Sequence, residues 1–415
     1  MITGSELVRG DRADQNGPFL AREVLRLGVE PARIAIVGDR EDELEDALRE
    51  GLRADLCVVS GGLGPTHDDR TVEVVARAAG VGLRLDDDLH REIGNISRRF
   101  AERTGRPYAD FEVGVRKQAT LPEGALSLGL AGTAPGLVLQ TNGAVVVILP
   151  GPPPELRRLW PHALETAPMR RLLEQAVAPE RRFLRFFGAS ESAVAKALAD
   201  AGGDGDGVEA TICARDFEIH LDMLVEPGAE KRADELSRRL LEPLGRYLFA
   251  EREVPVTELV LQACRARGLT LASAESCTGG MVAERLTSVA GSSDVFVGGI
   301  VAYSNDVKAR ELGVSEDVLA RHGAVSAETA AAMAAGARQR LAADVAVAVT
   351  GIAGPGGGTE EKPVGLVYLH ATGPDGAGAR EFIFPGDRDT VRRRASATAL
   401  HLVRRLLTQS RDERA

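Results

Sequence analysis

Serine, tyrosine and lysine lie close together in the carboxy-terminal part of the chain. Ser293 occurs in "GSSDVF", Tyr303 in "VAYSND", and Lys308 follows shortly after. A serine hydroxyl can attack a carbonyl carbon when a lysine or tyrosine of lowered pKa removes its proton, as in serine–lysine hydrolases that use no histidine. The 7 histidines lie outside these stretches, so a histidine-based triad is not favoured. These residue types predict acyl transfer by a serine.

A second candidate nucleophile, Ser276, lies in "AESCTGG", before a Gly-Gly pair that opens a predicted helix. Its neighbour Cys277 has no histidine motif beside it, and we interpret it as a small packing residue. Ser293 has a simpler interpretation as a helix or turn cap. An active site is favoured because three glycine-bearing loops, "AESCTGG", "GSSDVFVGGIVAYSNDVK" and "TGIAGPGGGTEEKPVG", can converge at strand ends. The residues do not decide whether Ser276 or Ser293 attacks.

An amino-terminal stretch, "GGLGPTHDDRT", has the character of an anion site. It follows an apolar run and precedes a helical one, so its glycines let backbone N–H groups approach an anion that the helix dipole favours. Asp68 and Asp69 suit such a site if a divalent cation lies between them and the anion, with Glu6 of "TGSEL" as a further ligand. The alternatives are that Asp68 caps the helix and that the glycines serve a tight turn.

The elements that position these residues alternate along the chain. Short apolar runs and amphipathic segments alternate in the first third, which predicts βαβ units and a parallel sheet. A small α+β unit follows, and near-continuous apolar runs such as "ADVAVAVTG" then predict strands of a second sheet covered on both faces. The predicted class is α/β, with two three-layer α/β domains and a small α+β domain between them. The predicted boundaries are 1–168, 169–252 and 253–415.

Composition excludes several classes of protein. The chain has 415 residues, 44% hydrophobic and 27% charged, which is too long for one core and typical of globular domains. No apolar run approaches the roughly 20 residues of a membrane span, and no secretory signal is evident. The 4 cysteines lack a disulfide or zinc pattern, and a net charge of -10 disfavours nucleic acid as a partner. We expect a cytoplasmic protein with reduced thiols.

Four stretches of the amino-terminal part carry a resemblance: "TGSEL", "GGLGPTHDDRT", "GTAPG" and "LPGPPPE". In this order they resemble the molybdopterin-binding-like domain of the competence/damage-inducible CinA family, which is associated with metal-dependent hydrolysis of ADP-ribose. The resemblance implies a divalent metal at Glu6, Asp68 and Asp69. It implies ligand contacts by Gly61, Gly62, Gly64 and Asn16, the last within "RGDRADQNGPFL", which departs from the family's usual pattern.

The middle part, with "LRFFGASESAVAKAL" and "EATICARDFEIHLDM", is similar to the KH-like domain that this family places between its two ends. A KH unit that binds RNA needs a GxxG loop in basic surroundings. Here the loop "GDGDG" is acidic, so we interpret this domain as a spacer.

The carboxy-terminal part resembles the CinA carboxy-terminal domain, a nicotinamide-nucleotide amidohydrolase, in "AESCTGG", "GSS", "AYSN" and "TGIAGPGGGTEEKPVG". The resemblance implies that Ser293 is the nucleophile and that Tyr303 and Lys308 activate it, without a cofactor. It also implies a homodimer. The residues expected around the mononucleotide are Ser276, Thr278, Gly279, Gly280, Thr350, Gly351, Gly354 and Arg392.

The predicted function is hydrolysis of nicotinamide mononucleotide to nicotinate mononucleotide and ammonia, with ADP-ribose as a second substrate at the amino terminus. Both substrates arise from breakdown of NAD. Two alternatives stay open. In one, only the amino-terminal pyrophosphatase is active and the other end senses nucleotides. In the other, the chain is a non-catalytic partner-binding protein of competence or DNA damage.

Overall fold

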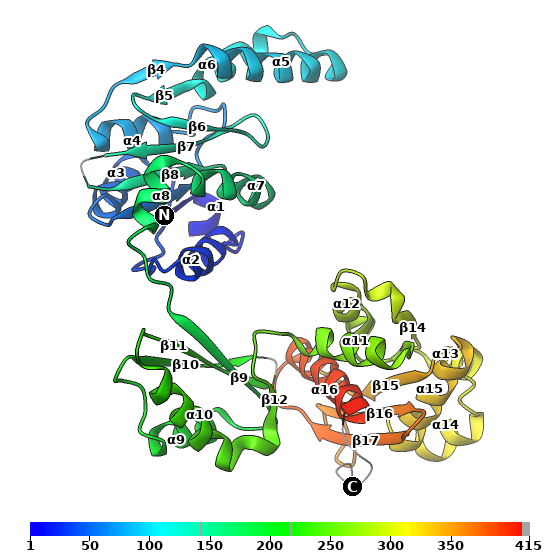
Figure 1. The fold of residues 1–415 in the computed structure, drawn as a ribbon. Helices are drawn as coiled ribbons and strands as arrows, with labels where there is room; N and C mark the ends of the chain where they lie inside the picture. Colours follow the sequence, from blue (N-terminus) through cyan, green and yellow to red (C-terminus); the bar gives the residue numbers. More distant parts are fainter. Residues whose placement is uncertain (142, 216, 409–415) are drawn as a thin grey trace. The chain divides into compact units, whose positions relative to one another are not determined.

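A computed structural model describes residues 1–141, 143–215 and 217–408 (Figure 1). The chain forms two compact units, Met1–Pro179 and Glu180–Ala415. Each unit has its own sheets and its own hydrophobic core. The two units are therefore described separately.

The first unit is built on a six-stranded sheet of order β2-β1-β3-β8-β7-β6. Its strands are β1 (Ile2–Thr3), β2 (Ile36–Val37), β3 (Leu56–Ser60), β6 (Leu126–Leu130), β7 (Pro135–Gln140) and β8 (Val145–Leu149). Strands β2, β1, β3 and β8 are parallel, while β7 and β6 are antiparallel to their neighbours. The predicted parallel sheet with crossover helices is confirmed, and its first strand has 2 residues.

Helices cover both faces of this sheet, so the unit has three layers (Figure 1). One core cluster joins the sheet to α3 (Glu41–Gly51), α4 (Thr71–Ala79), α5 (Asp87–Thr104) and α6 (Ala109–Gln118). The other joins it to α2 (Asn16–Arg26), α7 (Pro153–Leu164) and α8 (Ala167–Leu173). A short helix α1 (Ser5–Val8) and a two-stranded sheet of β4 (Leu83–Leu85) and β5 (Thr120–Pro122) complete the unit.

The second unit begins with a four-stranded antiparallel sheet of order β10-β11-β9-β12. Its strands are β9 (Glu180–Phe187), β10 (Val208–Arg215), β11 (Glu218–Val225) and β12 (Leu248–Ala250). Helices α9 (Glu191–Asp200) and α10 (Glu230–Leu244) pack on one face, where Phe186, Leu221 and Leu236 are buried. This is the predicted small α+β structure.

A five-stranded sheet of order β14-β13-β15-β16-β17 follows in the same unit. Its strands are β13 (Leu271–Glu275), β14 (Phe296–Val301), β15 (Val345–Gly351), β16 (Leu366–Gly373) and β17 (Gly376–Ile383). Helices α11 (Val256–Arg267), α12 (Met281–Thr287) and α16 (Arg388–Thr408) pack on one face. On the other face lie α13 (Asn305–Leu312), α14 (Glu316–His322) and α15 (Ala327–Arg340).

Strand β15 shows why this sheet is buried on both sides. Its sequence "VAVAVTG" alternates valine toward α11, α12 and α16 with alanine toward α13 and α15. The alanines leave room for the Ala-rich helix α15 to approach closely. A Cβ on Gly336 of α15 would overlap the carbonyl oxygen of Leu312 at the end of α13. Close packing of small residues thus fixes α13, which carries Lys308.

Helix α16 joins the two sheets of the second unit. His401 is fully buried on this helix, and its Nε2 lies 2.8 Å from Oε1 of Glu218 on β11. The other carboxylate oxygen of Glu218 lies 2.9 Å from His220 Nε2. The His401 ring stacks on Phe187 of β9, with centroids 3.8 Å apart and planes inclined by 12°. The two sheets therefore meet at the buried carboxylate of Glu218, which is hydrogen-bonded to two histidines, one of which stacks on Phe187.

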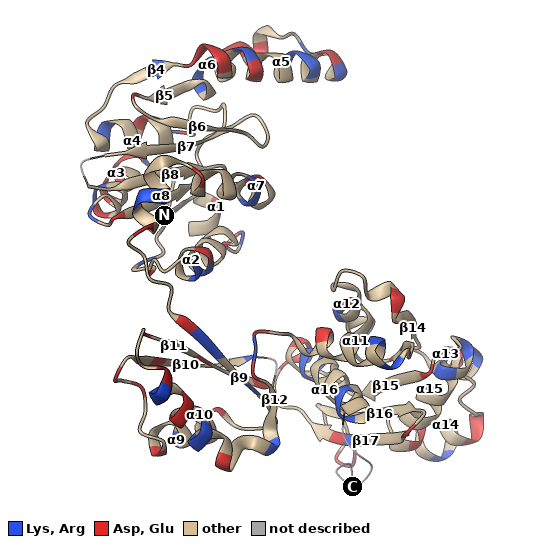
Figure 2. Ribbon diagram, viewed as in Figure 1, with Lys and Arg blue, Asp and Glu red and all other residues tan. Residues whose placement is uncertain are grey.

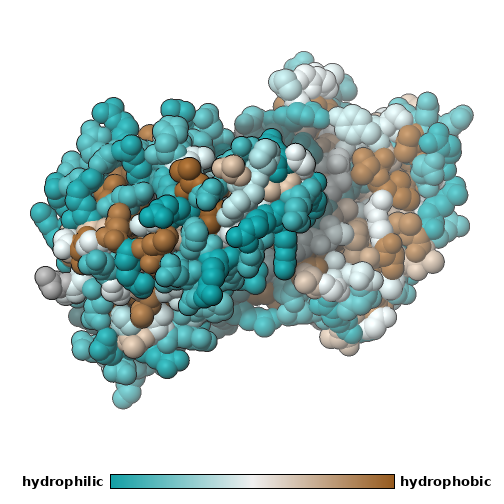
Figure 3. Space-filling view, turned by 90° about the horizontal axis from the view of Figure 1, so that it is seen from above, coloured by the Kyte–Doolittle hydropathy of each residue, from teal (hydrophilic) through white to brown (hydrophobic). Residues whose placement is uncertain are grey.

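Basic and acidic residues are interspersed on α5 and α10, so no basic stripe runs along these helices (Figure 2). Hydrophilic residues predominate on the face shown in Figure 3, beside several hydrophobic areas. Among the helices that the structure describes, none is long and apolar enough to cross a membrane.

Candidate active site

The buried amine of Lys308 contacts the hydroxyl of Ser276. Nζ of Lys308 lies 3.0 Å from Ser276 Oγ and donates a second hydrogen bond of 2.8 Å to the carbonyl of Ala302. Lys308 is 1% exposed and Ser276 is 8% exposed. Burial lowers the pKa of Lys308 below its ordinary value, because the charged ammonium loses its hydration. A lysine of this kind can remove a proton from the serine that it contacts.

Sheet register explains why these groups meet. Strands β13 and β14 are parallel, with Glu275 opposite Val301 at their carboxyl ends. Ser276 follows the first strand directly, and Ala302 follows the second, so both lie at the same edge of the sheet. The sequence-based prediction of loops that converge at strand ends describes this arrangement.

Glu275 holds the turn that presents Ser276. Its buried carboxylate accepts hydrogen bonds of 3.0 Å from the backbone N–H groups of Gly280 and Val282, and one of 2.9 Å from Ala283. Gly279 and Gly280 have left-handed φ values of 60° and 97°, which favour glycine. The first N–H groups of α12 are thus bound to a carboxylate of the chain itself. The Gly280 N–H is thus engaged within the chain, and contact of Gly279 and Gly280 with the mononucleotide stays a prediction.

Ser293 lies at the opposite edge of the same sheet. It belongs to the turn η2 (Ser292–Asp294), is exposed, and comes before β14, whereas Tyr303 comes after it. The partner strand β13 is 5 residues long, so its two ends are about 16 Å apart at roughly 3.3 Å per residue. One chain therefore does not bring Ser293 to Lys308. This corrects the expectation that Lys308 and Tyr303 activate Ser293 within the chain.

Two arginines at the start of α16 reach the site. Arg388 donates a 2.8 Å hydrogen bond to the Tyr303 hydroxyl and a 2.7 Å hydrogen bond to the carbonyl of Gly354. Arg392 donates a 2.9 Å hydrogen bond to the carbonyl of Thr278. The sequence indicated Arg392 and missed Arg388. The i, i+4 spacing in "RDTVR" could have identified it, because such residues share a helix face.

Other predicted contacts serve the fold. The Thr350 hydroxyl is buried and donates a 2.6 Å hydrogen bond to the carbonyl of Ala324. A Cβ on Gly351 would lie 2.6 Å from the carbonyl oxygen of Leu366 on the neighbouring strand. Thr278 differs, because its buried Oγ1 has no hydrogen-bond partner among the described residues. Of these residues, Thr278 has a side-chain hydroxyl uncommitted within the fold.

Cys277 is not suited to attack. Burial raises the pKa of its thiol to about 12, so the reactive thiolate is scarce at neutral pH. Its side chain lies in the hydrophobic core with α11, α12 and α16. This agrees with the interpretation of Cys277 as a packing residue.

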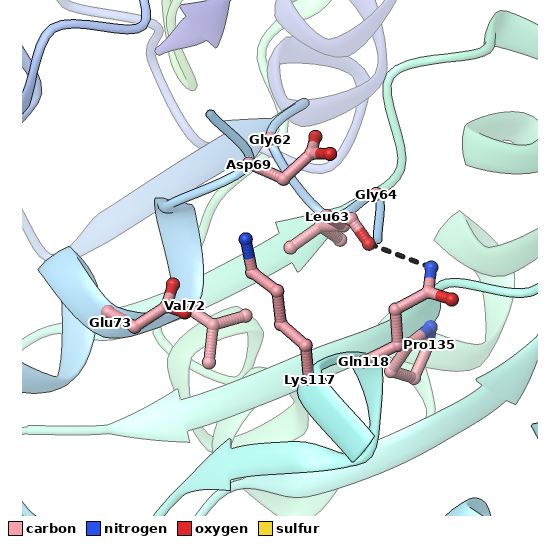
Figure 4. A pocket seen from close by; sticks show the side chains of 9 residues that line it. All are labelled: Gly62, Leu63, Gly64, Asp69, Val72, Glu73, Lys117, Gln118 and Pro135. Atoms are coloured by element: carbon pink, nitrogen blue, oxygen red, sulfur yellow. Dashed lines mark hydrogen bonds between the residues drawn. The ribbon is translucent and has the colours of Figure 1, made fainter. Parts of the chain in front are cut away.

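The amino-terminal unit has a hollow beside its glycine turn, which encloses about 270 Å³ with open solvent included (Figure 4). Gln118 of α6 donates a 3.0 Å hydrogen bond to the carbonyl of Leu63, and Lys117 donates one to the carbonyl of Thr66. Figure 4 shows the Lys117 amine pointing into the hollow. No sequence motif had indicated Lys117 or Gln118. The lining residues are Gly62, Leu63, Gly64, Asp69, Val72, Glu73, Lys117, Gln118 and Pro135.

Two other expected ligand contacts of this unit have structural roles. A Cβ on Gly61 would overlap Thr3, so the turn needs glycine to pack on β1. Asn16 is buried, and its Nδ2 donates hydrogen bonds of 3.0 Å to Ser60 Oγ and 2.7 Å to the carbonyl of Gly151. Asn16 therefore ties α2 to the end of β3 and to the proline-rich loop.

The carboxylates of "THDD" are bound within their own turn. Both Asp68 and Asp69 accept hydrogen bonds from the Thr66 hydroxyl, and Asp69 also accepts one of 3.0 Å from the Thr66 N–H. The Thr66 hydrogen bond lowers the pKa of Asp68. Within the described part of the chain, no three His, Cys, Asp or Glu residues form a group that could hold a metal. In the described residues Glu6, Asp68 and Asp69 therefore do not form one group, and a divalent metal in this unit stays a prediction.

Two family models match the chain. Residues 253–407 match the CinA C-terminal domain, and residues 1–169 match a probable molybdopterin binding domain. A CinA-like protein of Mycolicibacterium paratuberculosis is 45% identical over 430 residues, which cover 99% of this chain and 98% of that protein. The chain belongs to the CinA family.

A second CinA-like relative agrees with this. A CinA-like protein of Mycobacterium tuberculosis is 44% identical over 420 residues, covering 98% of this chain and 96% of that protein. A solved structure, the competence/damage inducible protein CihA from Agrobacterium tumefaciens, is 43% identical and covers 39% of this chain and 100% of its own, with a TM-score of 0.36. The recognition of the CinA family and of an α/β fold from sequence is confirmed.

Proposed function

We propose that the carboxy-terminal part hydrolyses the carboxamide of nicotinamide mononucleotide, with Ser276 as nucleophile and Lys308 as base. The observation that carries this proposal is the buried contact of 3.0 Å between Lys308 Nζ and Ser276 Oγ. The resemblance to nicotinamide-nucleotide amidohydrolases supports the choice of substrate. The nucleophile differs from the one that the resemblance suggested.

The chemistry needs only this pair and water. Ser276 Oγ bonds to the carboxamide carbon while its proton passes to Lys308 Nζ. The carbon–nitrogen bond then breaks, and the leaving nitrogen takes that proton and departs as ammonia. Water attacks the resulting ester with Lys308 again as base, which releases nicotinate mononucleotide and restores the serine. The lowered pKa of Lys308 supports this role, because only the neutral amine can accept the proton.

Substrate features match the surroundings of the pair. The pyridinium charge withdraws electrons from the carboxamide carbonyl, which eases attack. Arg388 and Arg392 lie on neighbouring turns at the start of α16 and supply positive charge for a phosphate. The start of α12 does not provide an anion site, because its N–H groups are bound to Glu275. The two arginines provide the positive charge instead.

The test is ammonia release from nicotinamide mononucleotide. We expect Ser276→Ala and Lys308→Met to lose at least about 1,000-fold in kcat, as when a catalytic nucleophile or base is removed. Methionine keeps the unbranched stem of the buried lysine. The matched controls, Ser293→Ala and Lys196→Met, should keep the wild-type rate. A wild type that releases no ammonia would refute the proposed function.

Ser293 provides a separate control, because a second copy of the chain could supply it to the site. If it did, mixing Ser276→Ala with Ser293→Ala would restore activity at sites that combine one intact residue from each copy. We expect Ser293→Ala to be active by itself, so the mixture should show only the activity of the Ser293→Ala that it contains. An inactive Ser293→Ala whose activity returns on mixing with Ser276→Ala would return the nucleophile to Ser293.

For the amino-terminal unit we propose hydrolysis of the pyrophosphate bond of ADP-ribose. Lys117 supports this, because it brings a cation into the hollow beside the glycine turn. Turnover of ADP-ribose should fall about tenfold or more in Lys117→Gln and stay near wild type in Lys231→Gln, on another domain. Parallel assays with EDTA and with divalent salts, in wild type and Asp68→Ala, test the metal dependence. Binding without turnover would instead favour nucleotide sensing.

A further inference from the structure

Tyr303 is an exposed aromatic side chain that is nevertheless anchored. It is 62% exposed, and its hydroxyl accepts a 2.8 Å hydrogen bond from Arg388. Arg388 is itself held by the carbonyl of Gly354 at 2.7 Å. Exposed aromatic rings without such anchors sample several rotamers, so this ring is preorganised at some cost in entropy.

The backbone ties this ring to the reacting groups. Tyr303 directly follows Ala302, whose carbonyl accepts the 2.8 Å hydrogen bond from Lys308. Lys308 in turn contacts Ser276. A ligand that lies against the Tyr303 ring is therefore close to the proposed nucleophile and base.

Among the residues that the structure describes, no aromatic ring or arginine stacks on a face of the Tyr303 ring. The Arg388 hydrogen bond engages the hydroxyl at the ring's edge and not its π face. Tyr108 and Tyr247 differ from Tyr303, because each lies beneath an arginine. An open, electron-rich face attracts a planar cation.

We infer that Tyr303 is a stacking platform for the cationic pyridinium ring of the substrate and not an acid or base. This inference rests on the proposed amidohydrolase function. Stacking on Tyr303 would orient the carboxamide toward Ser276, while the hydroxyl stays bound to Arg388. Lys308 already contacts Ser276, so the reaction needs no proton transfer by the phenol.

A cation above an aromatic face strengthens binding by about 2- to 30-fold. Binding can be measured directly in the Ser276→Ala background, where the ligand is not consumed. The probes are nicotinamide mononucleotide and its reduced form, which has the same outline but a neutral dihydropyridine ring. We expect Tyr303→Leu to weaken binding of the oxidised form by that factor and to bring the two affinities together. Tyr303→Phe should keep the preference within about twofold.

Steady-state kinetics in otherwise wild-type protein complete the test. Tyr303→Phe should keep kcat within about threefold, and Tyr303→Leu should act mainly on KM. A Tyr303→Phe variant that loses kcat as Ser276→Ala does would overturn the inference, since the phenol would then transfer a proton. Equal binding by Tyr303→Leu and its parent would also overturn it. Neither outcome affects the proposed function, which stands on ammonia release by the wild type.

Discussion

The buried junction between Glu218 and His401 should make the second unit lose stability in mild acid. Burial lowers the pKa of His401 from 6.5 to about 4. Arg404 and Arg405 on the same helix oppose its protonation further, while the hydrogen bond to Glu218 favours it. For Glu218, burial alone would raise the pKa, but hydrogen bonds from His220 and His401 outweigh it and bring the pKa to about 2.

The sign of the effect follows from proton binding. Between pH 6.5 and 4 the unfolded chain protonates His401 and the folded chain does not, so the free energy of unfolding falls as the pH falls. From pH 7.5 to pH 5 the two pKa values, 6.5 and about 4, give a loss of about 2 kcal/mol from this residue. Glu218 adds its own loss only below its ordinary pKa of 4.5. The chosen window therefore keeps the Glu218 contribution small, and comparison with a His401 variant cancels the contribution of His370, whose pKa burial also lowers.

The assay compares urea unfolding of wild type and His401→Gln at pH 7.5 and pH 5. Glutamine can donate a hydrogen bond to Glu218 but does not titrate. Far-UV circular dichroism follows the whole chain, while fluorescence of the single tryptophan, Trp160, reports the first unit alone. At pH 7.5 the variant should have a lower free energy of unfolding than wild type. Between pH 7.5 and pH 5 its free energy of unfolding should fall by about 2 kcal/mol less than that of wild type. Equal losses in the two proteins would refute the reasoning.

Three further predictions concern the site and its support. Gly336→Ala should destabilise the second unit by about 1–3 kcal/mol, measured by urea unfolding, because its Cβ overlaps the Leu312 carbonyl. Glu275→Gln should reduce kcat for ammonia release by about tenfold or more, because an amide replaces one of the two oxygens that accept N–H groups of α12. The rate should rise with pH to a plateau whose midpoint lies below 10.5, the ordinary pKa of lysine, because burial disfavours the ammonium form of Lys308. A midpoint at or above that value would contradict the assignment of Lys308 as base.

Parts of this structure could be read from the sequence because they depend on local patterns. The alternation of valine and alanine in 345–351 identified a strand buried on both faces, and glycine-bearing loops after apolar runs identified the edge where the site lies. The position of Ser293 could also have been derived. It precedes the strand 296–301 while Tyr303 follows it, and the two ends of a strand lie on opposite edges of a sheet.

Other parts depend on contacts that no local pattern records. Lys117 and Gln118 reach the glycine turn from a helix far along the chain, and no motif marks them. The sequence shows that Asp68 and Asp69 are present. Their hydrogen bonds from the Thr66 hydroxyl depend on the conformation of the turn. Residue type indicates what a side chain can bind, whereas the fold decides which partner it has.

Helix α16 connects the candidate active site to the four-stranded sheet β10-β11-β9-β12, here called the middle sheet, and this gives the sheet a packing role within the second unit. The helix has 21 residues and spans about 30 Å. Arg388 in its first turn contacts the site, and His401 further along is buried against the middle sheet. Phe217, in the turn just before β11, packs on Phe384, with ring centroids 5.6 Å apart. Removing that sheet would expose His401 and these aromatic faces to water, and the helix that carries Arg388 would lose packing along its length.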